Sequence, residues 1–249
     1  GGITGTLLHF TLPMMVGSFL QQCYNIADTL IVGQCIGAGA LAAVGSAYTL
    51  MVFLISVLLG LAMGSGTVFS LHYGAGNHVA LRRSIFSSFV LIGIVTLILN
   101  VAVFIWLDPI LRLLQVPQDI YGMMRSYLWI IFCGIVFTFI YNFYASLLRA
   151  VGDSVTPLWF LAVSVVLNIA LDLFFILQLD WGIQGAAAAT VLAQGVAALG
   201  IIIYTYRRRP ELRWHHEDMC FDRTCLKEIA SFSTLTCVQQ SVMNLGILM

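Results

Sequence analysis

Asp28 is an acidic side chain inside an apolar stretch, residues 8–32, that is long enough to cross a bilayer as a helix. A carboxylate inside a membrane costs a few kcal/mol or more, so such a residue is a candidate for function by default. Gly17, Gln21 and Asn25 lie at helical spacing before it and share its helix face. The alternative interpretation is a short anchor helix whose Asp28 marks the end in contact with water.

Further polar side chains interrupt the later apolar stretches. Asn168 and Asp172 are four residues apart in the fifth stretch, so they share one helix face. The rest of this polar set lies in the fourth and sixth stretches: Tyr127, Tyr141, Asn142, Thr190 and Gln194. Two carboxylates with an amide and a hydroxyl form an oxygen-rich set suited to a hard cation such as Na⁺. A proton is the other candidate, because two carboxylates close together at low dielectric cannot both ionise freely.

The composition indicates a protein with several membrane-spanning helices. Of the 249 residues, 60% are hydrophobic and only 9% are charged, whereas soluble domains carry about 25% charged residues. The net charge is zero, so no overall basic character suggests nucleic acid as a partner.

Six apolar stretches, with a seventh begun, predict an all-α fold. Their approximate bounds are 8–32, 41–70, 84–106, 121–147, 157–179 and 183–206, with the seventh starting near Ile229. Residues 33–40 are expected to form a short turn. Asp108 and Pro109 are expected to cap and open a short amphipathic segment, and Thr156 and Pro157 to be the N-cap and first residue of the fifth helix.

The distribution of basic residues predicts the orientation in the membrane. Nine lie in the loops after the second, fourth and sixth stretches: Arg82, Arg83, Arg149, Arg207, Arg208, Arg209, Arg213, Arg223 and Lys227. Only Arg112 and Arg125 lie on the opposite side. Because cytoplasmic loops are enriched in Lys and Arg, the even loops and the N-terminus are expected in the cytoplasm.

The depth of the polar groups follows from the rise of a helix. From the outer ends of their stretches, Asp28 lies about 6 Å, Asp172 about 10 Å and Asn168 about 16 Å into the membrane. The same estimate gives about 12 Å for Thr190 and about 9 Å for Tyr127. All five lie in the outer half of a core about 30 Å thick, so we expect them to converge on one pocket. Taken singly, Asn168, Thr190 and Tyr127 fit hydrogen bonding between helices better than ion binding.

Pro13 lies about four helical turns before Asp28. A proline inside a helix removes a backbone hydrogen bond and favours a bend, which would link the carboxylate to helix shape. The alternative is a proline at the start of the helix.

A weak internal repeat suggests a second bundle. Gln21-Gln22 in the first stretch has a counterpart in Gln239-Gln240, and an asparagine follows each pair within four residues, Asn25 and Asn244. We therefore divide the chain into a six-helix bundle over residues 1–206, a cytoplasmic linker over 207–228 and the first helix of a second bundle over 229–249. The chain is interpreted as a fragment of a longer protein.

Several segments, in order along the chain, carry a family resemblance: Leu12-Pro13, residues 21–29, 41–45, 73–76 and 148–157, Asn168-Ile169-Ala170-Leu171-Asp172, and residues 181–190. In these segments the chain resembles the MATE (multidrug and toxic compound extrusion) transporters, most closely prokaryotic members of the DinF-like or MepA-like kind. The resemblance implies a twelve-helix fold of two six-helix bundles around a cavity that opens alternately to each side.

The resemblance also implies a function. The protein would export organic cations and amphipathic drugs, across the plasma membrane of a prokaryotic cell, against an inward flow of Na⁺ or H⁺. Its partners would be these small molecules, the bilayer and the missing C-terminal bundle, and it would need no cofactor. The cation ligands, for Na⁺ if the protein is sodium-coupled, would be Asp28, Asn168, Asp172 and Thr190. Candidates for substrate binding or proton relay are Gln21, Asn25, Tyr127, Tyr141 and Asn142.

Other classes fit the sequence less well. A flippase for lipid-linked precursors would need a basic cavity, whereas the apolar stretches contain almost no Lys or Arg. An intramembrane metalloprotease would need a His-Glu-x-x-His pair, which is absent from the sequence. Cys220 and Cys225 lack the second cysteine pair of a typical zinc site. The sequence disfavours a non-transporting membrane subunit only weakly.

Overall fold

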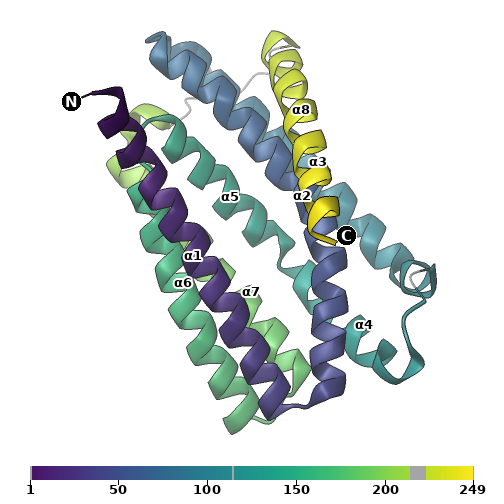
Figure 1. The fold of residues 1–249 in the computed structure, drawn as a ribbon. Helices are drawn as coiled ribbons and strands as arrows, with labels where there is room; N and C mark the ends of the chain where they lie inside the picture. Colours follow the sequence, from purple (N-terminus) through teal and green to yellow (C-terminus); the bar gives the residue numbers. More distant parts are fainter. Residues whose placement is uncertain (1, 114, 214–222, 249) are drawn as a thin grey trace. The chain divides into compact units, whose positions relative to one another are not determined.

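The computed structural model describes residues 2–113, 115–213 and 223–248, apart from the side chains of some helical residues, Gln21 and Asn25 among them. In this part of the chain every regular element is helical (Figure 1). The α-helices are α1 (Ile3–Cys35), α2 (Ala38–Gly74), α3 (His78–Leu113), α4 (Gln118–Cys133), α5 (Ile135–Ala150), α6 (Val155–Leu173), α7 (Ile183–Arg208) and α8 (Arg223–Leu248). A π-helical turn, η1 (Phe174–Gln178), follows α6, and a 3-10 turn, η2 (Pro210–Leu212), follows α7.

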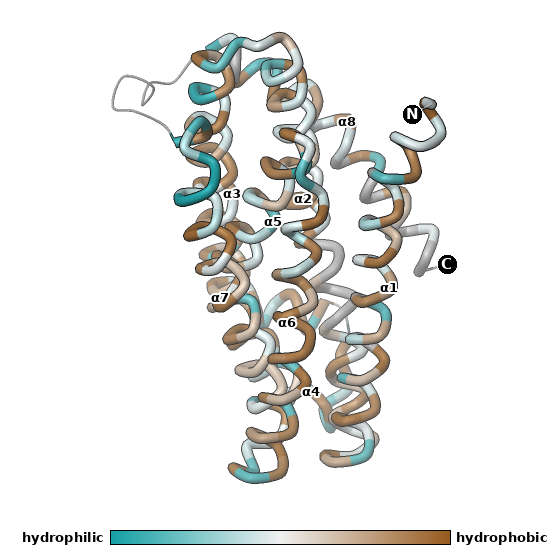
Figure 2. The backbone as a smooth tube through the Cα atoms, turned by 90° about the vertical axis from the view of Figure 1, so that its left-hand side faces the viewer, coloured by the Kyte–Doolittle hydropathy of each residue, from teal (hydrophilic) through white to brown (hydrophobic). Residues whose placement is uncertain are grey.

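Five segments of the described chain are long and apolar enough to span a membrane, and α4 with α5 makes a sixth if the pair counts as one bent span. Figure 2 shows hydrophobic residues along most of the length of these helices. The predicted all-α, multi-pass membrane fold is confirmed. The fourth span was predicted as one helix over 121–147, but α4 and α5 meet at 48° around Gly134.

Gly134 lies at the break in this span, where α7 passes close to its backbone. A Cβ atom added at Gly134 would lie 2.7 Å from both Cγ atoms of Val191, closer than packed atoms approach. Only glycine fits here. The Gly134 N–H bonds to the Ile131 carbonyl in a tight final turn of α4 at 3.0 Å, and the next helix leaves in a new direction.

The helices extend beyond the apolar stretches that predicted them. The expected turn over residues 33–40 reduces to the junction between Cys35 and Ala38, where Gly37 has a φ of +126° that favours glycine. The seventh helix begins at Arg223 rather than near Ile229. Hydropathy locates the part of a helix in lipid, whereas backbone hydrogen bonding continues into the polar ends.

One prediction about prolines agrees with the structure and another is wrong in detail. Trp106 (φ −108°, ψ 19°) is non-helical and divides α3 at a kink, so Asp108 and Pro109 stand near the start of a short helical segment, as predicted, and this segment ends at Leu113. A proline removes one helical hydrogen bond and crowds the preceding turn, which explains a kink three residues earlier. The N-cap of α6 is Ser154, not Thr156, so Pro157 occupies the third helical position. The first turn tolerates it because its N–H groups have no helical acceptor.

Pro13 lies inside α1, not at its start, so the alternative of a proline that opens the helix is wrong. Asp108 in α3 contacts two side chains of α4. Its Oδ1 accepts hydrogen bonds from the Tyr121 hydroxyl at 2.7 Å and from Arg125 Nε at 2.9 Å.

The chain forms two compact units. The first combines Gly1–Thr49, Asn100–Phe137 and Ser154–Ala197, and the second combines Leu50–Leu99, Thr138–Asp153 and Ala198–Met249. In the first, α1 packs along α6 (Figure 1). The core of the second contains an aromatic cluster of Phe69, Phe89, Phe139 and Phe143, with ring centroids 5.4–6.0 Å apart. Of the predicted linker over 207–228, residues 214–222 lie outside the described residues.

Candidate functional site

Helices α1 and α6 bury the two acidic side chains that the sequence singled out. The side chain of Asp28 is 7% exposed and that of Asp172 is fully buried. The face of α1 that carries Asp28 turns toward α6, because an added Cβ at Gly17 would lie 3.6 Å from Leu158 and 3.7 Å from Leu161. The predicted common face of Gly17 and Asp28 is therefore the face that packs against α6.

Hydrogen bonds join three helices beside these carboxyl groups. Asn168 in α6 donates from Nδ2 to the Tyr24 hydroxyl in α1 at 2.9 Å and to Thr190 Oγ1 in α7 at 3.4 Å. The Tyr24 and Thr190 hydroxyl oxygens are 3.2 Å apart. Thr190 donates in turn to the Ala186 carbonyl at 3.1 Å. The expected meeting of the fifth and sixth spans at Asn168 and Thr190 is present, with Tyr24 as a third member.

Four buried oxygen atoms of this site receive no hydrogen bond within the described residues: Asp28 Oδ1, Asn168 Oδ1 and both carboxylate oxygens of Asp172. The carboxyl groups of Asp28 and Asp172 are also direct electrostatic neighbours. Unpartnered buried oxygens are costly, and two adjacent carboxylates more so. These oxygen atoms would therefore suit a bound hard cation as its ligands, or the two carboxylates would share a proton.

The ligand type also restricts the cation. No cluster of three or more His, Cys, Asp and Glu side chains occurs among the described residues. The unsatisfied atoms are instead carboxylate and amide oxygens, which suit a hard cation better than a soft transition metal.

Tyr127, predicted at the same depth, contributes a third buried side chain from α4. It is 4% exposed, and both Asp28 and Asp172 interact with it electrostatically. The side chains of Gln21 and Asn25 lie outside the described residues, although both belong to α1.

Tyr141 and Asn142 belong to the other compact unit. Asn142 donates from Nδ2 to the Thr138 carbonyl one turn earlier in its own helix, at 2.8 Å, and Tyr141 is buried. Their prediction as substrate or relay residues stays a prediction.

Tyr24 was not predicted as a site residue. It stands four residues before Asp28 in the sequence, which places it on the same face of α1. That spacing was the available signal. Its contact with Thr190, 166 positions away in the sequence, requires the packing of α1 against α7.

The π-helical turn η1 begins two residues after Asp172 and was also not predicted. The Phe175 and Trp181 rings stack there with centroids 4.8 Å apart, and an added Cβ at Gly185 would lie 3.0 Å from Phe175 Cβ. The wide turn and this close contact set the start of α7 against the end of α6. They thereby place Thr190 beside Asn168.

Comparison with known proteins identifies the family. The MatE family model matches residues 13–174. A "Probable multidrug resistance protein YpnP" of Bacillus subtilis is 36% identical over 84% of this chain and 47% of its own length. The "Multidrug export protein MepA" of Staphylococcus saprophyticus is 31% identical over 81% of this chain and 45% of its own length. The chain thus spans about half the length of the curated relatives it matches.

A solved structure gives the same result for the fold. The crystal structure of a MATE in the bent conformation is 26% identical, with a TM-score of 0.88 over 100% of this chain and 55% of that chain. The matched helices include α1 and α6, which carry both acidic residues of the site. This multi-pass membrane chain therefore belongs to the MatE family of transporters.

Proposed function

We propose that the chain forms one six-helix half of a transporter that exports organic cations and amphipathic drugs in exchange for inward Na⁺ or H⁺. The multidrug resistance and multidrug export relatives, of which it spans about half, support this proposal. Residues 1–206 form the bundle, the segment between α7 and α8 links it to the other half in the cytoplasm, and α8, which begins at Arg223, is the first helix of that half.

The proposed location is the plasma membrane, with the N-terminus in the cytoplasm. The basis is the distribution of basic residues, because nine lie in the loops assigned to the cytoplasm and only two on the opposite side. Among the two on the outer side, Arg125 pairs with Asp108 at 2.9 Å, which lowers the net positive charge there.

The proposal rests on the buried cluster around Asp28 and Asp172, in which carboxylate oxygens receive no hydrogen bond within the described residues. Both carboxylates, the Asn168 amide oxygen and the Thr190 hydroxyl would hold Na⁺, or the carboxylates would share a proton. Tyr127 would relay protons or contact substrate at this site. Gln21 and Asn25 on α1, with Tyr141 and Asn142, would contact substrate along the export path.

The cationic drug and the coupling ion, Na⁺ or H⁺, compete for this site, and this competition couples export of the drug to entry of the ion. Ionised Asp28 and Asp172 attract a cationic drug, and this attraction is strong at low dielectric. A Na⁺ ion or a proton arriving from outside neutralises the pair, so the drug is released. Pro13 allows α1 to bend as this happens, which agrees with the existence of a bent conformation in a similar MATE. The ion shifts the equilibrium between the straight and bent states of α1 only because it binds one state more tightly than the other.

The test uses the full-length protein expressed in cells that lack their own drug efflux. Asp28→Asn removes a charge but little volume and is expected to abolish drug resistance at unchanged membrane expression. Asp180→Asn is the matched control, because Asp180 is exposed in the turn before α7 and asparagine tolerates its φ of +54°. Unchanged resistance in Asp28→Asn would contradict the proposal. Drug efflux from inverted vesicles under separate Na⁺ and pH gradients then identifies the coupling ion.

A further inference from the structure

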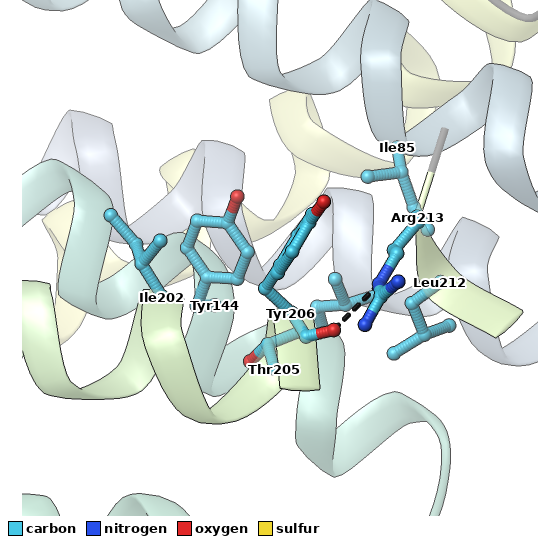
Figure 3. Close-up of a pocket in the computed structure, with 8 residues that line it drawn as sticks. Ile85, Tyr144, Ile202, Thr205, Tyr206, Leu212 and Arg213 are labelled. Carbon is cyan, nitrogen blue, oxygen red and sulfur yellow. Dashed lines mark hydrogen bonds between the residues drawn. The ribbon is translucent and has the colours of Figure 1, made fainter. Parts of the chain in front are cut away.

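The second compact unit contains a cavity of about 190 Å³ between α3, α5 and α7 (Figure 3). Ile85, Leu147 and Ile202 provide apolar walls, and Tyr144, Tyr206 and Arg213 provide polar groups. This cavity shares no residue with the acidic cluster of the first unit. The lining is apolar at Ile202 and becomes cationic toward Arg213, farther along the chain.

The Arg213 guanidinium is held in a fixed position at this cavity. Its Nε donates to the Tyr206 carbonyl at 2.6 Å, and its Cζ lies 4.0 Å from the centroid of the Tyr206 ring (Figure 3). The stacked ring adds a cation–π attraction. A guanidinium has five N–H donors, so the contact with Tyr206 leaves four for a ligand.

No acidic side chain neutralises Arg213 in the described part of the chain. The nearby acids are engaged with another base: Arg209 pairs with Glu211 at 3.4 Å and with Asp153 at 4.0 Å. Arg207 and Arg208, exposed in the last turn of α7, add positive charge at the same end of this helix. The cavity therefore favours an anion and disfavours the cationic drugs proposed above as export substrates.

The position of the cavity along α7 selects the kind of anion. Ile202 lies within the apolar part of α7, while Tyr206 and the arginines that follow it mark the boundary between membrane and water. A ligand that matches both ends has an acyl chain and an anionic headgroup. Planar guanidinium groups bind phosphate oxygens with two parallel hydrogen bonds.

We propose that this cavity binds an anionic phospholipid, with the phosphodiester on Arg213 and an acyl chain along Ile85, Leu147 and Ile202. The proposal takes only the membrane orientation from the function proposed above. In that orientation the cavity opens at the cytoplasmic leaflet, the side on which basic pockets between helices bind acidic lipid headgroups. The lipid would contact α3, α5 and α7 together and so stabilise their packing.

The test measures lipid binding to the purified full-length protein in a neutral detergent, by native mass spectrometry. The probes are dioleoyl phosphatidylglycerol, dioleoyl phosphatidylcholine and glycerol 1-phosphate. We expect one phosphatidylglycerol to bind in preference to phosphatidylcholine, and Arg213→Gln to weaken its binding about fivefold. Arg207→Gln is the matched control, because it removes the same charge from an exposed position outside the cavity lining.

A second variant tests the apolar wall independently of charge. Ile202→Trp fills the cavity while keeping Arg213, and it is expected to weaken phosphatidylglycerol binding as well. Unchanged binding in Arg213→Gln overturns the proposal, and an equal loss in Arg207→Gln replaces it with a diffuse basic surface. Displacement of the lipid by an equal concentration of glycerol 1-phosphate overturns the lipid as occupant. None of these measurements depends on transport, so a failure here is distinct from a failure of the proposed export function.

Discussion

Asn168 donates a hydrogen bond from its amide nitrogen to the Tyr24 hydroxyl at 2.9 Å, which joins α6 to α1 beside the two buried aspartates. This bond determines which atom of the Asn168 amide stays available to a ligand. The nitrogen is occupied by hydroxyl acceptors, and the oxygen is buried without a donor within the described residues. Tyr24 therefore orients Asn168 as an acceptor, which is the form in which an amide binds a cation.

Replacing Tyr24 by phenylalanine should weaken cation binding without removing any proposed ligand. The amide of Asn168 loses its shorter acceptor and becomes free to turn, and loss of such supporting hydrogen bonds typically costs about tenfold in metal affinity or more. The measurement is the Na⁺ or H⁺ concentration that gives half-maximal drug efflux. Tyr121→Phe is the control, because it loses a 2.7 Å hydrogen bond to Asp108, away from this cluster. Equal cation dependence in Tyr24→Phe and wild type would contradict the role of Tyr24.

Asp172→Asn should abolish coupled transport and still stabilise the protein in sodium-free buffer. The two oxygens of Asp172 are buried without hydrogen-bond donors next to Asp28, so one charge fewer relieves desolvation and repulsion. Replacing buried charges is neutral or stabilising by about 1–4 kcal/mol in other proteins. Thermal unfolding in NaCl and in KCl measures the effect. Na⁺ should raise the melting temperature of the wild type and not of the variant, and a clear destabilisation of Asp172→Asn in KCl would refute the argument.

The part of the site that sequence could predict depends on helix geometry alone. The four-residue spacing of Asn168 and Asp172 fixes a common face, and a rise of about 1.5 Å per residue gives their depth relative to Thr190. Both quantities follow from the geometry of a single helix and do not depend on how the helices pack. The structure accordingly places Asn168 within hydrogen-bonding distance of Thr190.

The features that sequence did not predict depend on contacts between distant segments. Tyr24 gains its role from Asn168 and Thr190, and the close approach of Val191 is what requires a glycine at position 134. Neither partner can be recognised from one sequence, because a glycine or a tyrosine in an apolar helix has many possible neighbours. The helix ends were missed for another reason, since hydropathy does not report the hydrogen bonds that extend a helix to Cys35 or start one at Val155.

Gly134→Ala should destabilise the first unit by overpacking. The new methyl group would lie 2.7 Å from the Val191 side chain, and such crowding costs about 1–3 kcal/mol. Gly122→Ala is the control in the preceding helix, because an added Cβ there meets nothing within 4 Å. Thermal unfolding of both variants is the measurement. The double variant Gly134→Ala with Val191→Ala should recover part of the loss, and no recovery would place the cause elsewhere than in this contact.

Pro13→Ala should slow drug export while leaving the protein folded. Alanine restores the backbone N–H that can bond to the carbonyl four residues earlier, at His9, and it removes the ring that crowds this turn. The helix is then more stable when straight, so the bent state becomes less populated. The measurement is the rate of drug efflux at saturating cation gradient, with thermal unfolding as the check of folding. Pro117→Ala serves as the control, because Pro117 is an exposed residue that precedes α4 and interrupts no helix. An unchanged efflux rate in a folded Pro13→Ala variant would show that bending at Pro13 does not limit transport.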